Sequence, residues 1–278
     1  MNKKLLNYIQ IALTIALIVF IFLKAGEFFE KVDWNVIANN WPSIIIAGVF
    51  FALGYVFMAH HWAFVCRIIT PKTGKKQWLA FFASQPYKYL PTSIFTFSSR
   101  ATFAKRLGMN FRQSTEAQVL ENINLIGTAI IIGFWFLLLQ FNFLYALAVI
   151  ALVRLVGLAI WTKDTITVPK LKVAIDLKKW LISLTIVSAG WLVMGIGFFI
   201  LVFGLENRVD PVLSIASNSL ATGFGITAVF APGGIGVREL IFSYLSFASG
   251  TILIWRLTTF TVDILVGIWA GWAISRQR

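Results

Sequence analysis

One segment near the carboxyl end places a proline, three glycines, an arginine and a glutamate between two long apolar runs. Backbone this irregular leaves N–H and C=O groups without helical partners. It therefore cannot face lipid and must be buried in protein or line a wet cavity. A fixed positive charge beside a fixed negative charge in such a cavity is typical of a substrate site. The segment consists of Ala231, Pro232, Gly233, Gly234, Ile235, Gly236, Val237, Arg238 and Glu239.

The chemistry of this segment suits a phosphate group. Gly233, Gly234 and Gly236 have no side chains, so their backbone can come close to a ligand. Free amides at a helix start attract anions, and Arg238 offers two donors in one planar group. Tight packing of a hairpin is the alternative explanation of the glycines, and both explanations can hold together.

Two further charges lie inside the last apolar stretch. Arg256 and Asp263 are seven residues apart, so they share one helix face but stand roughly 10 Å apart along the axis. They are too distant to pair with each other. Each needs another partner, such as Glu239, Glu121 or substrate. Structural ion pairs between helices are the alternative to a substrate role.

Polar side chains also lie near the start of an earlier apolar stretch, 115–139. Glu121 and Asn122 are predicted to face the same cavity as the glycine-rich segment. Glu121 has a second interpretation, in which it only neutralises Arg100 or Arg112. Arg100 is the basic residue nearest to a proline-interrupted stretch, and we expect it to contact a headgroup.

Composition defines the class of protein that must position these residues. The chain has 278 residues, of which 59% are hydrophobic and 13% charged, with a mean hydropathy of +0.82. These values predict an all-α polytopic membrane protein. The net charge of +13 is explained by basic cytoplasmic loops, and we expect no nucleic-acid partner. The single cysteine and two adjacent histidines predict no disulfide, metal or other cofactor.

Six stretches are long and apolar enough to be predicted as transmembrane helices. Two other stretches, 77–97 and 211–249, are interrupted, the first near Pro91 and the second at the proline–glycine segment. Basic clusters flank 77–97 on both sides, and arginines end the chain. Because basic residues favour the cytoplasm, both stretches are predicted to enter the membrane and return. The six predicted helices are 5–23, 41–66, 115–139, 143–160, 180–203 and 250–274.

Two re-entrant hairpins of opposite orientation indicate an inverted repeat, with a substrate site near the bilayer midplane. The sequence therefore predicts one integral membrane domain over 1–278, with both termini in the cytoplasm. The alternative is that one or both hairpins cross fully, which gives seven or eight spans. Gly267 and Gly271 form a GxxxG pattern, which suits internal packing or a homodimer contact.

The segment 231–239 resembles the carboxyl-terminal signature of the lysylphosphatidylglycerol synthetase transmembrane-region family. This family includes the membrane half of the multiple peptide resistance factor and small flippase-like proteins. The layout of most of the chain is similar. The resemblance implies lipid translocation without the soluble synthetase domain that follows in some family members.

The first half of the family pattern is matched less well. The family often has a leucine–proline–glycine stretch, an arginine, and then a glutamate–arginine pair on the next helix. The chain has Leu90-Pro91 with Thr92 in place of the glycine. Arg100 and Glu121 match, and Asn122 replaces the second arginine, so the identity of the cargo is left open.

The residues and the resemblance together predict a flippase or scramblase in a prokaryotic inner membrane. The expected partner is a lipid with an anionic or phosphate-containing headgroup, either a phospholipid or a polyprenyl-phosphate-linked glycolipid. No nucleophile or metal constellation suggests an enzyme. The alternative function is a non-transporting membrane partner that regulates a lipid-modifying enzyme.

Overall fold

A computed structural model places most of the chain in long helices. Four of them are long and apolar enough to cross a membrane: α3 (Trp41–Ile69), α6 (Phe111–Phe141), α8 (Leu177–Glu206) and α11 (Ser249–Ser275). The protein is an all-α polytopic membrane protein, as predicted. The structure describes residues 33–71, 73, 76–90, 94–145, 147, 165–168, 173–208, 210–228 and 231–276.

The four long helices confirm four of the predicted spans, with ends shifted by a few residues. The predicted helix 5–23 lies outside the described residues, and so does nearly all of 143–160. A short antiparallel pair, β1 (Thr165–Val168) and β2 (Val173–Asp176), precedes α8. The side chain of Asp176 accepts from the backbone N–H of Lys179 at the start of α8. This bond holds the pKa of the Asp176 carboxyl below its usual value.

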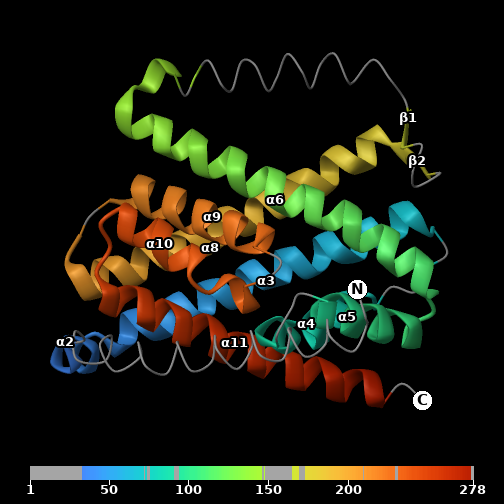
Figure 1. The fold of residues 1–278 in the computed structure, drawn as a ribbon, viewed down its shortest axis with the longest axis horizontal. Helices are drawn as coiled ribbons and strands as arrows, with labels where there is room; N and C mark the ends of the chain where they lie inside the picture. Colours follow the sequence, from blue (N-terminus) through green and yellow to red (C-terminus); the bar gives the residue numbers. More distant parts are fainter. Residues whose placement is uncertain are drawn as a thin grey trace, which may run out of the picture.

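Shorter helices lie between the long ones (Figure 1). We call α4, η1 and α5 the first hairpin, and α9, η2 and α10 the second hairpin. Before them, α2 precedes α3. Their bounds are α2 (Trp34–Asn39), α4 (Trp78–Ser84), η1 (Gln85–Tyr89), α5 (Ile94–Arg106), α9 (Pro211–Thr227), η2 (Pro232–Gly234) and α10 (Val237–Tyr244).

The first hairpin returns to the end of the bundle where it starts. The amide of Gln77 donates to the carbonyls of Ala104 and Leu107, at 3.4 and 3.0 Å, so the two ends of the hairpin are joined. The arm from Trp78 to Tyr89 is roughly 18 Å long if helical, too short for a hydrocarbon core of about 30 Å. The predicted break near Pro91 falls between the two arms, outside the described residues.

The second hairpin is joined at its base in the same way. The Arg208 guanidinium donates to the Ser246 carbonyl at 3.1 Å, and the Ala248 N–H donates to the Glu206 carboxylate at 3.0 Å. The last arm ends at Tyr244 rather than at 249 as predicted, because a turn with positive φ at Ser246 precedes α11. In each hairpin the two ends therefore lie at the same end of the bundle, as expected for a segment that enters a membrane and returns.

The two hairpins enter from opposite ends of the bundle. The end of α8 lies against the beginning of α3, where Gly204 faces Ser43, so α3 and α8 are antiparallel. The first hairpin follows the end of α3 and the second follows the end of α8. Figure 1 shows α4 and α5 toward the end of the molecule opposite to that where α8 leads into α9. The orientation is that of an inverted repeat.

The tips of the hairpins meet beside α11. Gly233 in η2 lies against the ring of Tyr89 in η1, with 3.2 Å between the ring and the place a Cβ would take. Helix α11 packs along both α3 and α4. On the first hairpin, Pro86 sits against Gly267, where a Cβ would overlap the proline ring. Half of the GxxxG pattern thus serves internal packing, while nothing lies within 4 Å of a Cβ at Gly271.

Candidate functional site

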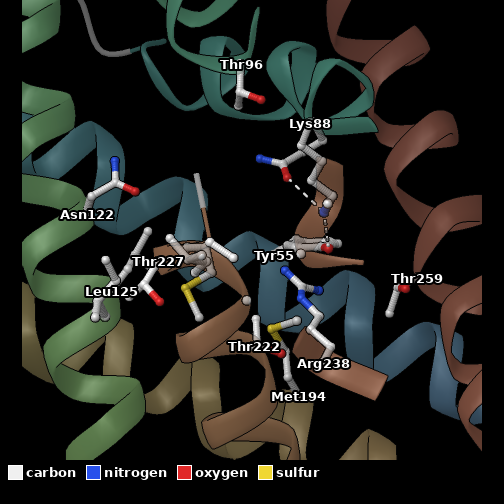
Figure 2. A pocket seen from close by; sticks show the side chains of 18 of the residues that line it. Tyr55, Lys88, Thr96, Asn122, Leu125, Met194, Thr222, Thr227, Arg238 and Thr259 are labelled. Carbon is white, nitrogen blue, oxygen red and sulfur yellow. Dashed lines mark hydrogen bonds between the residues drawn. The ribbon is translucent and has the colours of Figure 1, made fainter. Parts of the chain in front are cut away.

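A cavity of ≈ 460 Å³ lies where the two hairpins meet. Its wall is formed by α3, α6, α8, α11 and both hairpins (Figure 2). Much of the wall is apolar, and three basic side chains line it: Lys88, Arg100 and Arg238. The lining includes these predicted site residues: Arg100, Asn122, Gly233, Gly234 and Arg238. Five other predicted residues do not line it: Glu121, Gly236, Glu239, Arg256 and Asp263. The side chain of Pro232 is outside the described part of the structure.

Arg238 is a buried cation without a counterion in the described part of the chain. It is 9% exposed and stands at the beginning of α10. Its Nε has no hydrogen-bond partner, and no described carboxylate forms an ion pair with it. Its guanidinium lies 5.7 Å from the centre of the Trp255 ring. Since buried charges are normally paired, this guanidinium is free to bind an anion in the cavity.

Gly225 makes the position of Arg238 possible. A Cβ on Gly225 would overlap the Nε and Cγ of Arg238, and a Cβ on Gly234 would lie only 2.8 Å from the Gly225 Cα. Gly233, Gly234 and Gly236 have φ values of 58°, 70° and 88°. This left-handed conformation favours glycine. The glycines therefore shape the turn that brings Arg238 to the cavity.

Arg256 and Glu239 hold this turn instead of lining the cavity. The Arg256 Nε lies 2.5 Å from a Glu239 carboxylate oxygen. Its Nη1 and Nη2 donate to the carbonyls of Gly233 and Gly234 at 2.9 and 3.2 Å. The other Glu239 oxygen accepts from the Gly236 N–H at 2.7 Å. The arrangement matches the structural ion pair considered as an alternative from the sequence.

Asp263 has a partner that sequence reasoning did not identify. Its carboxylate lies 2.7 Å from the Lys88 Nζ and accepts from the Tyr89 hydroxyl at 2.6 Å. The Lys88 ammonium also donates to the hydroxyl of Tyr55 at 3.0 Å and to Gln85 at 3.4 Å. One feature of the sequence could have indicated this partner as a site residue. Lys88 is a lysine among aromatic residues and prolines, in a stretch predicted to enter the membrane.

Arg100 also lines the cavity, and its charge is neutralised by a carboxylate that does not line it. Its Nη1 forms an ion pair with the fully buried Glu121. Its Nε donates to the Ser84 hydroxyl at 2.9 Å. The guanidinium lies 4.8 Å from the Phe81 ring centre and 5.3 Å from that of Trp62. The simpler interpretation of Glu121, as the counterion of Arg100, agrees with this geometry.

Uncharged polar groups complete the wall. The Asn122 amide donates to the Gln118 carbonyl at 2.7 Å, one turn earlier on α6. On α9, Thr222 lines the cavity, and its buried hydroxyl has no hydrogen-bond partner among the described residues. One turn before it, both amide atoms of the buried Asn218 lack partners within the same residues. Neither α9 residue was predicted as part of the site, because small polar residues are common in helix contacts.

Within the described residues, the site therefore combines one unpaired cation, two ion pairs and a partly polar wall at the meeting point of two broken helices. Such an arrangement has the chemistry to bind an anionic group and to hold it away from lipid. A scan against protein-family models finds no match for this chain, and a search of curated proteins finds none either. The interpretation of the site depends on its geometry and chemistry.

Proposed function

We propose that this protein moves a lipid with a phosphate-containing headgroup between the two leaflets of a membrane, as a flippase or scramblase. The observation that carries the proposal is Arg238, a buried guanidinium without a carboxylate partner among the described residues, facing a cavity between two oppositely inserted hairpins. The resemblance of 231–239 to flippase-like proteins supports the same function, in a prokaryotic inner membrane.

The barrier to lipid movement explains why such a cavity is useful. A charged headgroup that enters hydrocarbon alone loses its hydration, which costs at least several kcal/mol. A cation and polar side chains inside the protein replace part of that hydration. The volume of ≈ 460 Å³ lies at the lower end of the range of about 300–1,000 Å³ for small-molecule sites. It suits a headgroup whose tails stay in lipid.

Transport also requires the site to open to each side in turn. The hairpins meet tip to tip, and each is held to α11 by its own ion pair, Lys88–Asp263 and Arg256–Glu239. In transporters with inverted repeats, movement of one repeat against the other gives alternating access to a central site. Movement of the hairpins relative to α11 would do the same here.

The test is lipid movement in liposomes that contain only the purified protein. Fluorescent phosphatidylglycerol is placed in both leaflets, and a membrane-impermeant reductant quenches the label that reaches the outside. The wild type should expose nearly all of the label, whereas Arg238→Ala should behave like empty liposomes, because the cavity then lacks its unpaired cation. Arg112→Ala is the matched control, since Arg112 is an exposed arginine that pairs with Glu116 away from the cavity.

Each result of this assay separates the proposed function from the alternative. If a range of labelled phospholipids and polyprenyl-phosphate lipids all stay in their leaflets with the wild type, the protein is not a translocator. A regulatory partner of a lipid-modifying enzyme then becomes the better explanation. Full activity of a well-folded Arg238→Ala protein would leave translocation standing and remove the role given to Arg238.

A further inference from the structure

The charges around the cavity leave one positive charge unbalanced. In the part of the chain that the structure describes, the charged residues that line it are Lys88, Arg100 and Arg238. Lys88 is paired with Asp263 and Arg100 with Glu121. Within the described part of the chain, Arg238 has no such partner. Three cations and two carboxylates therefore give the site a net charge of +1.

The nearest other ion pair does not change this balance. Arg256 and Glu239 neutralise each other at 2.5 Å, behind the turn formed by Gly233 and Gly234. The remaining wall residues among those that the structure describes are uncharged. A ligand with a single negative charge would make the occupied site neutral, whereas a ligand with two or more would bury an uncompensated charge, which is costly.

Two of the cations face the same part of the cavity. Figure 2 shows Lys88 reaching from η1 and Arg238 reaching from α10 toward the hydroxyl of Tyr55. The Lys88 ammonium donates to this hydroxyl at 3.0 Å. An anion bound to the Arg238 guanidinium at this place would also meet the ammonium of Lys88. Lys88 is then both a partner of Asp263 and a second donor to the ligand.

From this charge balance, and on the basis of the proposed function, we propose that the cavity selects a lipid phosphodiester, which carries one negative charge. Arg238 binds the non-bridging oxygens through two donors, and Lys88 adds a third. Asp263 and Glu121 keep the net charge of the empty site at +1, and we call this the charge limit of the site. It disfavours phosphomonoesters, which carry close to two negative charges at neutral pH, and it disfavours diphosphates. Apolar wall residues such as Met58, Leu125 and Ile126 favour a ligand with a hydrocarbon tail.

The selectivity can be measured by equilibrium binding to the purified full-length protein in detergent. Farnesyl methyl phosphate, farnesyl phosphate and farnesyl diphosphate share one tail and differ in headgroup charge, and dimethyl phosphate is a diester without a tail. The farnesyl diester should bind at least about tenfold more tightly than the diphosphate, because the diphosphate brings at least one uncompensated charge to a partly solvated site. Dimethyl phosphate should bind more weakly than the farnesyl diester.

Variants of the two carboxylates test the charge limit directly. Asp263→Asn and Glu121→Gln each raise the net charge of the site by one, so each should shift the preference toward the diphosphate by about tenfold. Glu116→Gln is the matched control, because it removes a carboxylate from a surface pair and should leave the preference unchanged. Arg238→Gln should weaken diester binding by about tenfold or more, because charged hydrogen bonds are lost.

The outcomes separate this inference from the proposed function. A wild type that prefers the diphosphate overturns the charge limit without any variant, even if lipid movement in liposomes is normal. Folded Asp263→Asn and Glu121→Gln proteins with unchanged preference overturn it as well. Equal binding of dimethyl phosphate and the farnesyl diester would assign the site to a soluble anion. Selective diester binding without movement in liposomes would support the inference and refute translocation.

Discussion

At the scale of single residues, the site depends on which charges are paired and which are not. Arg238 in α10 and Arg256 in α11 both lie beside the glycine-rich turn, yet their environments differ. Arg256 has a carboxylate and two backbone carbonyls as partners, whereas Arg238 has only the Trp255 ring within the described residues. We therefore assign Arg256 to the shape of the turn and Arg238 to the ligand.

Replacing Arg256 should affect stability first. Arg256→Met removes the donors to the carbonyls of Gly233 and Gly234 and leaves the Glu239 carboxylate with the Gly236 N–H but without its counterion. The expected loss is about 2 kcal/mol, because removal of one partner from a buried pair is costly but this pair is partly exposed. Thermal unfolding in detergent should show a clearly lower Tm. Arg112→Met, which removes an exposed arginine, should change Tm little, and equal effects of the two would refute the assignment.

At the scale of elements, small residues decide how closely the helices approach. Gly54 and Gly190 bring α3 and α8 together, and Gly197 lies against Phe50 and the Ala47 carbonyl. In a membrane, where lipid is as apolar as a side chain, such close packing replaces the hydrophobic effect as the force between helices. The contact between α3 and α8 is therefore the base from which both hairpins project.

A methyl group at this contact should destabilise the bundle. In Gly197→Ala, the new Cβ would lie 2.8 Å from the Phe50 Cβ and 3.2 Å from the Ala47 carbonyl, and neither atom can move without a shift of α3. We expect a loss of about 1–3 kcal/mol, as for other overpacked cores. Gly127→Ala on α6 is the matched control, because nothing lies within 4 Å of its Cβ and alanine favours a helix. A Tm of Gly197→Ala at or above that of Gly127→Ala would contradict the packing.

The sequence predicts the helices and their interruptions better than it predicts the contacts between their side chains. Apolar length predicted the four long helices, and proline and glycine predicted both interruptions, because these residues break helical hydrogen bonding. The partner of Asp263 was not predictable. Lys88 is 175 residues away in the chain, and one lysine among many basic residues carries no sign of its neighbour. Only the folded arrangement of η1 against α11 brings the two together.

At the scale of the whole molecule, the two hairpins enter from opposite ends, and this orientation predicts a membrane topology. Basic residues surround the base of the first hairpin, at Lys105, Arg106 and Arg112, which favours the cytoplasm for that end. The base of the second hairpin, at Arg208 and Ser246, must then lie on the opposite side. This topology predicts that the two hairpins bring their tips to the cavity from opposite sides of the membrane.

Cysteine labelling in intact cells tests this topology. The native Cys66 is fully buried, so it should contribute little background. Arg208→Cys should react with a membrane-impermeant maleimide added outside, because this position lies at the outer base of the second hairpin. Arg112→Cys, an exposed position at the base of the first hairpin, should react only after the membrane is permeabilised. Labelling of both positions from outside would show that the hairpins do not enter from opposite sides, and the reverse pattern would invert the molecule in the membrane.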